Sequence, residues 1–170
     1  MNLSRCIRDI PDFPKKGIIF KDITTLLSNK KAFRKSIDGL AKLLKGKKID
    51  YIVAAESRGF IFGGALAYKL GCGFVPIRKP GKLPYKTYRQ TYSLEYGKDS
   101  LEIHKDAFPA NSHILVLDDL LATGGTAIAL VRLVKKLKGK VVAIAVLIEL
   151  AFLFGRKKLK GYPIYSLIEY

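Results

Sequence analysis

The chain has 170 residues, of which 49% are hydrophobic and 26% are charged, and its formal net charge is +17 at pH 7. This length predicts one domain, residues 1–170, and the longest apolar stretch, residues 141–154, is too short for the ~20-residue helix that crosses a membrane. The basic residues are spread in small clusters without a recognised DNA-reading motif, which argues against dedicated nucleic-acid binding but fits attraction of a polyanionic substrate.

The first 27 residues are expected to form an extended covering segment, because Pro11 and Pro14 exclude a helix across residues 11–14. The N-terminus lacks the apolar core of a signal peptide. Cys6 and Cys72 have neither disulfide nor metal spacing, so we expect a cytoplasmic protein. A helix is then predicted from Ser28, acting as its N-cap, to about Leu44.

Residues 50–55 are an apolar run typical of a buried strand, and residues 60–70 have a helical pattern that Gly71 ends. Between them lies Glu56-Ser57-Arg58-Gly59. An arginine in a turn between a strand end and a helix start suits an anion. A salt-bridged arginine at a helix N-terminus explains the same residues equally well.

A third segment begins with a predicted strand, residues 73–77, and continues into Arg78-Lys79-Pro80-Gly81-Lys82, which indicates a mobile surface loop with solvated lysines. Alternation then predicts a hairpin with its turn at residues 97–99 and a return strand over residues 101–104. By its sequence position alone, Glu95 is an exposed strand carboxylate. We expect neither His104 nor His113 to be catalytic.

The most informative stretch is residues 114–130. Residues 114–117 predict a short buried strand, and Asp118 and Asp119 stand at its C-terminal end. A glycine-rich turn, residues 122–126, leads into an amphipathic helix whose first N–H groups can bind an anion. The combination predicts a phosphate cradle beside two carboxylates, which suits a sugar phosphate or its bound metal.

Two more strands, over residues 141–150 and 163–168, complete an alternation of strands and helices. This alternation predicts an α/β fold with a mainly parallel twisted sheet flanked by helices. Ligands of such sheets bind beyond the C-terminal strand ends, where Arg58, Lys79, Asp118 and Asp119 all fall.

Residues 116–126, Val-Leu-Asp-Asp-Leu-Leu-Ala-Thr-Gly-Gly-Thr, resemble the phosphoribosyl-diphosphate (PRPP) signature of the type I phosphoribosyltransferases, and their wording is similar to the adenine-specific members. Four further motifs follow the same family pattern, at residues 11–14, 17–24, 78–84 and 92–97. The resemblance implies the type I phosphoribosyltransferase fold, with an N-terminal hood (residues 1–27) and a flexible catalytic loop (residues 78–92).

The resemblance also implies that the protein transfers a phosphoribosyl group to adenine in purine salvage, giving AMP and diphosphate. It implies Mg²⁺ held mainly by PRPP and water, with Asp118 and Asp119 as the candidate protein ligands, and a homodimer. It further implies a non-proline cis peptide bond at Glu56-Ser57 or Ser57-Arg58. The implied roles are catalysis by Glu95, Asp118 and Asp119; phosphate binding by Ala122, Thr123, Gly124, Gly125 and Thr126; diphosphate binding by Arg58, Lys79 and Lys82; and adenine binding by Ile19, Phe20, Lys21 and Leu150.

The sequence leaves two alternative functions open. One is a phosphoribosyltransferase for another base, which the hood motif argues against. The other is a non-catalytic, PRPP-responsive regulator that binds nucleic acid through the positive surface. The presence of Glu95 and of the loop lysines Lys79 and Lys82 argues against this regulator.

Overall fold

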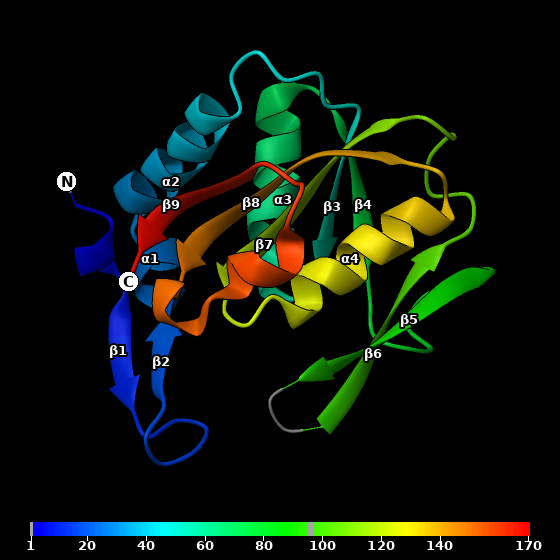
Figure 1. Ribbon diagram of the computed structural model, residues 1–170. Helices are drawn as coiled ribbons and strands as arrows, with labels where there is room; N and C mark the ends of the chain where they lie inside the picture. Colours follow the sequence, from blue (N-terminus) through cyan, green and yellow to red (C-terminus); the bar gives the residue numbers. More distant parts are fainter. Residues whose placement is uncertain (1, 95–96) are drawn as a thin grey trace.

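The computed structural model describes residues 2–94 and 97–170. Its centre is a five-stranded sheet in the order β4-β3-β7-β8-β9, and each neighbouring pair is parallel (Figure 1). This arrangement confirms the predicted α/β fold. The strands are β3 (Tyr51–Ala55), β4 (Gly73–Ile77), β7 (His113–Leu121), β8 (Lys140–Glu149) and β9 (Ile164–Glu169).

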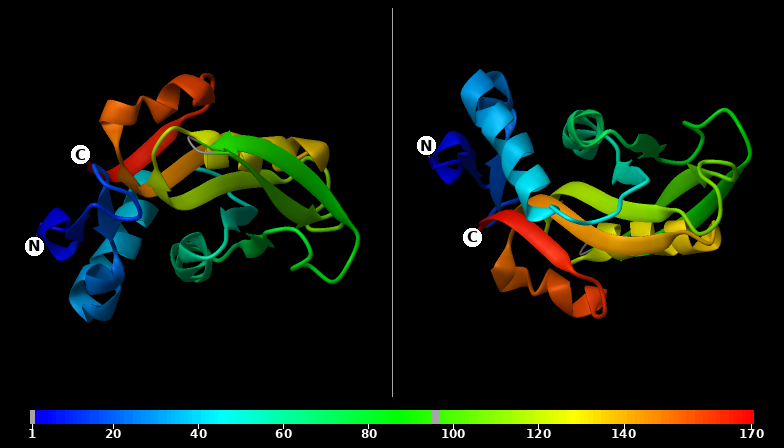
Figure 2. Two further views of the ribbon diagram at one scale, coloured as in Figure 1. Left: turned by 90° about the horizontal axis from the view of Figure 1, so that it is seen from below. Right: turned by 90° about the horizontal axis from the view of Figure 1, so that it is seen from above.

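Helices cover both faces of the sheet. Helices α2 (Lys30–Leu43) and α3 (Arg58–Leu70) lie on one face, and α4 (Gly125–Lys136) lies on the other (Figure 2). Alternate residues of β7 join the two cores: Ile114 packs with the α4 side and Leu115 with the α2–α3 side. The period of two along a strand therefore explains why this segment is apolar without interruption.

The N-terminal segment is more regular than expected. Strand β1 (Arg8–Pro11) pairs antiparallel with β2 (Ile19–Asp22), after a short 3-10 turn η1 (Ser4–Cys6) and before helix α1 (Thr24–Ser28). Residues 8–11 and 19–22 are extended and no helix crosses residues 11–14, as predicted, whereas residues 4–6 and 24–27 are helical and were not predicted to be.

The predicted N-cap of the next helix, Ser28, was also wrong. Ser28 ends α1, and its hydroxyl donates to the Thr25 carbonyl at 3.2 Å. Asn29 caps α2 instead, because its side chain accepts hydrogen bonds from the backbone N–H groups of Lys31 and Ala32, each at 3.1 Å.

Strands β5 (Thr87–Leu94) and β6 (Gly97–His104) form the antiparallel hairpin. The predicted turn at residues 97–99 was wrong, since the register pairs Gly97 with Leu94 and places residues 97–99 in β6. Residues 87–92, expected to be part of the catalytic loop, are in β5. The irregular segment is therefore residues 78–86, and Glu102 of β6 holds it by accepting from the Gly81 N–H at 3.2 Å.

After β8 the chain forms two 3-10 turns, η2 (Ala151–Leu153) and η3 (Gly155–Leu159), before it returns as β9. Within the described part of the chain, no helix combines the length and the apolar character that crossing a membrane requires.

Candidate active site

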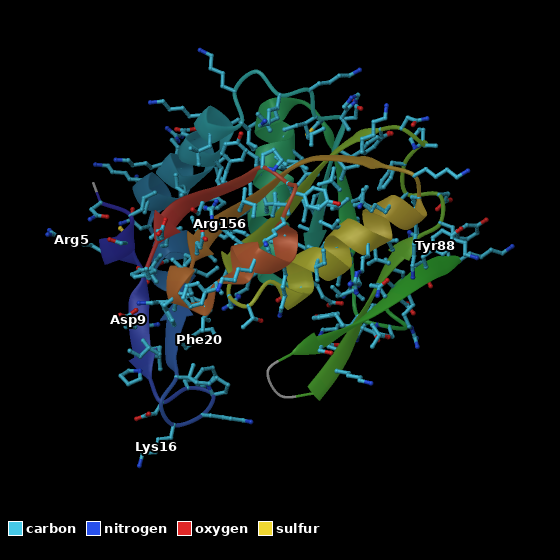
Figure 3. The ribbon with its side chains drawn as sticks, in the orientation of Figure 1. Arg5, Asp9, Lys16, Phe20, Tyr88 and Arg156 are labelled. Atoms are coloured by element: carbon cyan, nitrogen blue, oxygen red, sulfur yellow. The ribbon has the colours of Figure 1, made fainter. Side chains whose placement is uncertain are left out.

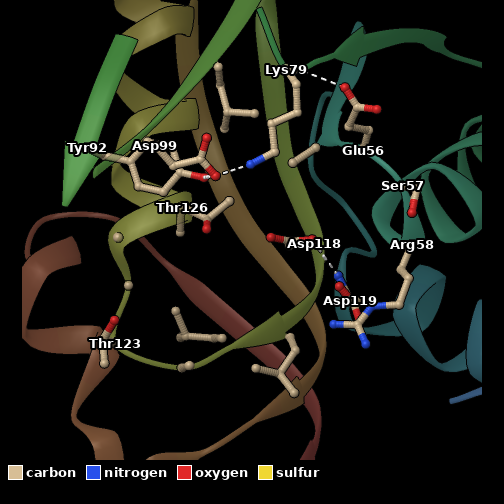
Figure 4. Close-up of a pocket in the computed structure, with 18 residues that line it drawn as sticks. Glu56, Ser57, Arg58, Lys79, Tyr92, Asp99, Asp118, Asp119, Thr123 and Thr126 are labelled. Carbon is tan, nitrogen blue, oxygen red and sulfur yellow. Dashed lines mark hydrogen bonds and ion pairs between the residues drawn. The ribbon is translucent and has the colours of Figure 1, made fainter. Parts of the chain in front are cut away.

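A cavity of about 470 Å³ opens at the C-terminal ends of β3 and β7. It is walled by the turn after β3, the second half of β7, the turn at residues 122–126, Lys79, and three residues of the β5–β6 hairpin (Figure 4). Parallel strands bring these segments, which are far apart in sequence, to one edge of the sheet.

Asp118 and Asp119 lie in the C-terminal part of β7, which runs on to Leu121, so the predicted end of this strand at Leu117 was wrong. They lie beyond the end of β3, however, because the pairing of β7 with β3 stops at Leu117 while its pairing with β8 continues. This offset leaves Asp118 facing the cavity on the side where β3 has ended. The Asp119 backbone N–H donates to Asp118 Oδ1 at 2.9 Å.

The two carboxyl groups share an environment that disfavours charge. Removal from water raises the pKa of Asp118 well above its ordinary value, and the neighbouring charge of Asp119 raises it further. Burial also raises the pKa of Asp119, although the Arg58 guanidinium, 2.8 Å away, opposes this rise. A ligand that offers hydroxyl groups or positive charge would therefore stabilise the ionised pair.

The turn at residues 122–126 combines close packing with free donors. Gly124 is the N-cap of α4 at φ 81°, and the helix begins at Gly125. A Cβ atom on Gly124 would lie 2.6 Å from the Gly155 carbonyl oxygen, and one on Gly125 would lie 2.8 Å from the Ser93 carbonyl oxygen. Glycine is thus required here by packing. The first N–H groups of the helix, which have no partner inside the helix, can bind an anion.

Cationic groups lie on the opposite wall. Arg58 is the first residue of α3 and directly follows the Glu56-Ser57 peptide bond, which is cis, as predicted. The Lys79 N–H donates to Glu56 Oε1 at 2.5 Å, and its ammonium group forms an ion pair with Asp99. Arg58 and Lys79 therefore flank the cavity from α3 and from the start of the loop (Figure 4).

Of the predicted site residues, the structure brings together Arg58, Lys79, Asp118, Asp119 and residues 122–126. Lys82, Ile19, Phe20, Lys21 and Leu150 are outside the cavity lining, and Glu95 lies outside the described residues.

The hood reaches the edge of the site, because the Arg58 guanidinium lies 5.1 Å from the ring centre of Phe20. The Lys21 ammonium group is directed elsewhere: it pairs with Asp9 at 2.8 Å and lies 3.7 Å from the Tyr170 ring centre. The Lys21 side chain is therefore engaged by Asp9 of the hood and by Tyr170 at the C-terminal end of the chain.

Three further polar residues line the cavity and were not predicted from the sequence: Glu56, Tyr92 and Asp99. Glu56 follows β3 directly, so the rule about C-terminal strand ends could have identified it. Asp99 was hidden by the wrong hairpin turn, since the correct register pairs it with Tyr92. The Tyr92 hydroxyl donates to Asp99 Oδ2 at 3.4 Å, and burial raises the pKa of Tyr92. A Cβ atom on Gly125 would lie 3.6 Å from the Tyr92 ring. These residues connect the hairpin to the glycine-rich turn.

The oxygen atoms that the cavity offers fit a divalent cation whose ligands come mainly from bound substrate. The described residues contain no group of three or more His, Cys, Asp or Glu side chains that could hold a metal ion. The cavity offers the two carboxylates of Asp118 and Asp119, and carboxylate oxygens are ligands that Mg²⁺ prefers. Arg58 already engages one of them. A metal here would have to draw most of its ligands from substrate and water.

Comparison with known proteins gives a consistent result. Residues 22–164 match the model of the phosphoribosyl transferase domain. The chain is 59% identical over 170 residues to an adenine phosphoribosyltransferase of Thermotoga sp. (strain RQ2), covering 100% of both chains. The solved adenine phosphoribosyltransferase of Thermoanaerobacter pseudethanolicus superimposes with a TM-score of 0.97 at 60% identity, over 99% of this chain and 98% of that one. The Saccharomyces cerevisiae enzyme, solved with an imino-altritol bisphosphate and adenine, gives 0.91 at 44% identity, over 97% and 96%.

Proposed function

This chain belongs to the phosphoribosyltransferase family, and from that premise we propose that it catalyses the adenine phosphoribosyltransferase reaction of purine salvage. Adenine and PRPP are converted into AMP and diphosphate. The observation that carries the proposal is the glycine-rich turn at the N-terminus of α4, which stands beside Asp118 and Asp119 in one cavity.

The turn at residues 122–126 holds the 5-phosphate of the ribose. Its backbone N–H groups and the N-terminus of α4 provide donors and a favourable dipole for an anion. The hydroxyl groups of Thr123 and Thr126, which both line the cavity, add further donors. This end of the cavity thereby fixes the sugar relative to β7.

Asp118 and Asp119 bind the ribose hydroxyl groups from the strand side of the cavity. The transition state is cation-like at the glycosidic carbon, as in glycoside chemistry, and nearby carboxylate charge stabilises it. Burial raises the pKa of both groups, so it is the bound ligand that stabilises their ionised form, in a site with little water. Such charge acts more strongly on the developing cation than it would in solvent.

Arg58 and Lys79 receive the leaving diphosphate, and Lys82 joins them when the loop closes. Two of these cations are held by carboxylates in the structure: Arg58 by Asp119 and Lys79 by Asp99. Bound Mg²⁺ would neutralise diphosphate charge, with Asp118 and Asp119 as its candidate protein ligands. Closure of the segment 78–86 would exclude the water that competes with adenine for the sugar.

Adenine binds under the hood. The backbone near Ile19 and Lys21 can match the donor and acceptor edge of the base, Phe20 can stack on its ring, and Leu150 can add an apolar contact. The contact between Phe20 and Arg58 supports this placement, because it joins the hood to the diphosphate wall. We assign Glu95 to proton transfer at the purine.

We also propose that the protein acts as a homodimer in the cytoplasm. Tyr68 is 92% exposed and Ile61 is 42% exposed. They lie seven residues apart on α3 and hence on one side of the helix. An apolar face of this kind suits a second copy of the chain, with the loop near residues 78–82 close to the neighbour. The cysteines Cys6 and Cys72 are free thiols, which suits a reducing compartment.

A turnover assay tests the proposal. The protein is supplied with PRPP, Mg²⁺ and, in turn, adenine, hypoxanthine, guanine or orotate. Adenine is expected to be the preferred substrate and to give AMP. Preference for another base would reject the specificity. Absence of turnover with every base, together with tight DNA binding at about 0.15 M salt, would favour the regulator, which the relatives named above do not support.

A further inference from the structure

We propose that the ion pair between Glu149 and Arg156 positions the turn at residues 122–126, although neither residue lines the cavity. On this view both are positioning residues for the ribose 5-phosphate. The inference rests on the proposed function and extends it to a part of the chain, after β8, to which that function assigns no phosphate contact.

The carboxylate of Glu149 and the guanidinium of Arg156 are joined by two hydrogen bonds. Glu149 is the last residue of β8 and its side chain is only 4% exposed, whereas Arg156 lies in η3. Arg156 Nε donates to Glu149 Oε1 and Nη2 donates to Oε2, each at 2.6 Å. These two parallel bonds fix the orientation of the guanidinium as well as its distance.

Arg156 is also bonded to the next strand. Its Nη1 donates to the Ile164 carbonyl at 3.3 Å and its Nη2 donates to the Ser166 hydroxyl at 3.2 Å, so the side chain extends from η3 towards β8 and β9 (Figure 3). The hydrogen bonds from Arg156 hold the pKa of Glu149 below its ordinary value. Glu149 therefore stays ionised and the pair stays formed.

The backbone beside this pair touches the first half of the turn, at Ala122 and Gly124. Gly155, next to Arg156, packs so closely that a Cβ atom on it would lie 2.2 Å from the Ala122 carbonyl oxygen. A Cβ on Gly124 would meet the Gly155 carbonyl oxygen at 2.6 Å. On the other side, Glu149 pairs with Leu121 in the sheet, and the Leu150 N–H donates to the Leu121 carbonyl at 2.9 Å.

Through these contacts the Gly155 backbone supports the turn. The ion pair of the neighbouring Arg156 fixes the position of Gly155. Only the Glu149 side chain of this pair is buried, whereas that of Arg156 is 47% exposed. Such a pair is a poor source of net stability, because removing the carboxylate from water costs free energy and water weakens its attraction to the exposed guanidinium. Binding an anion by N–H groups, in contrast, depends strongly on their positions. The geometry therefore assigns the pair to positioning of the turn.

Binding measurements on the full chain test the inference. Calorimetry would give the dissociation constants of AMP, whose phosphate uses the turn, and of inorganic diphosphate with Mg²⁺, which uses the opposite wall. Arg156→Ala is expected to weaken AMP binding by about tenfold or more and to leave diphosphate binding within about twofold. Arg156→Lys keeps the charge without the second parallel bond and should recover part of the loss. In turnover, Arg156→Ala should raise the KM for PRPP more than it lowers kcat.

Asp50→Asn is the matched control. Asp50 accepts from the N–H of His113 at 2.7 Å and lies 2.9 Å from its Nδ1, so it anchors the other end of the same strand, β7. This variant perturbs a carboxylate contact to β7 far from the turn and should keep the AMP affinity of the unmodified chain. Glu149→Gln provides a second test of the pair if Arg156→Ala does not fold, and it should also weaken AMP binding selectively.

Selective loss of AMP binding in the Arg156 and Glu149 variants would support the inference. Unchanged AMP affinity in these variants, or an equal loss of AMP and diphosphate, would overturn it. An equal loss of AMP binding in Asp50→Asn would also overturn it, by showing that general loosening is the cause. If the unmodified chain bound neither AMP nor diphosphate, the proposed function itself would fail, and the inference with it.

Discussion

The Nε atom of Arg58 lies 2.8 Å from Oδ2 of Asp119, which joins the first residue of α3 to the central strand β7. The cavity thus contains a cation for the diphosphate and an anion for the ribose in direct contact before any substrate binds. Asp119 keeps a raised pKa despite this contact, because burial outweighs the neighbouring charge. The following predictions depend on this arrangement of opposite charges.

Replacing both aspartates, Asp118→Asn with Asp119→Asn, should lower kcat/KM by orders of magnitude while the fold is kept. The asparagines conserve side-chain shape but remove the negative charge that stabilises the cation-like transition state. Steady-state kinetics and circular dichroism provide the measurement. Turnover close to that of the unmodified chain would remove both residues from the site.

Asp118→Asn alone should make the protein more stable near neutral pH. The folded-state pKa of Asp118 is raised, so the folded chain binds this proton more tightly than the unfolded chain does. Its contribution to the free energy of unfolding is therefore present at low pH and is lost as pH rises from the unfolded pKa through the folded one. The gain in Tm of the variant should be larger at about pH 7 than at about pH 4. A gain that is the same at both values would contradict the raised pKa.

Gly124→Ala should weaken phosphate binding more than it lowers the stability of helix α4. Gly124 has φ 81°, and an added Cβ would meet the Gly155 carbonyl oxygen at 2.6 Å. Gly46 has a nearly equal φ of 80° with nothing within 4 Å, so Gly46→Ala isolates the conformational cost, about 1–2 kcal/mol. Thermal unfolding and AMP affinity, measured on both variants, separate the two effects. Equal AMP affinity in both would argue against the turn as the phosphate site.

Lys79→Ala should weaken the binding of diphosphate with Mg²⁺ by about tenfold, because a charge-assisted contact to the leaving group is removed. Lys79 lines the cavity and Lys82 does not, so Lys82→Ala is expected to have a smaller effect on binding and to act mainly on kcat, when the loop closes. Lys98→Ala, an exposed position on β6, is the control and should bind diphosphate normally. A larger binding loss for Lys82→Ala than for Lys79→Ala would reverse these assignments.

Much of the fold could be predicted from the sequence because its signals are local. The apolar runs of β3, β7 and β8, and the glycine at the end of α3, are visible without tertiary information. The errors arose where two neighbouring residues competed for one role. Asn29 rather than Ser28 caps α2, and Leu94–Gly97 pairing rather than a turn at residues 97–99 ends the hairpin. Such choices depend on side-chain geometry and register, which composition does not encode.

Part of the candidate site could likewise be predicted from the sequence, and part could not. Arg58 and the turn at residues 122–126 follow strand ends, and Asp118 and Asp119 lie in the C-terminal part of β7. The topology rule for parallel sheets therefore predicts that they meet. Asp99 and Tyr92 enter the cavity from a separate hairpin, and their position depends on its register. The support of the turn by Gly155 is a backbone contact between segments about thirty residues apart, and no local pattern indicates it.

A crystal structure of the protein with AMP bound tests the central claim most directly. The account predicts that the AMP phosphate lies within hydrogen-bonding distance of the backbone N–H groups of residues 122–126, with the ribose hydroxyl groups facing Asp118 and Asp119. A structure in which this turn is empty and AMP occupies another part of the molecule would contradict it.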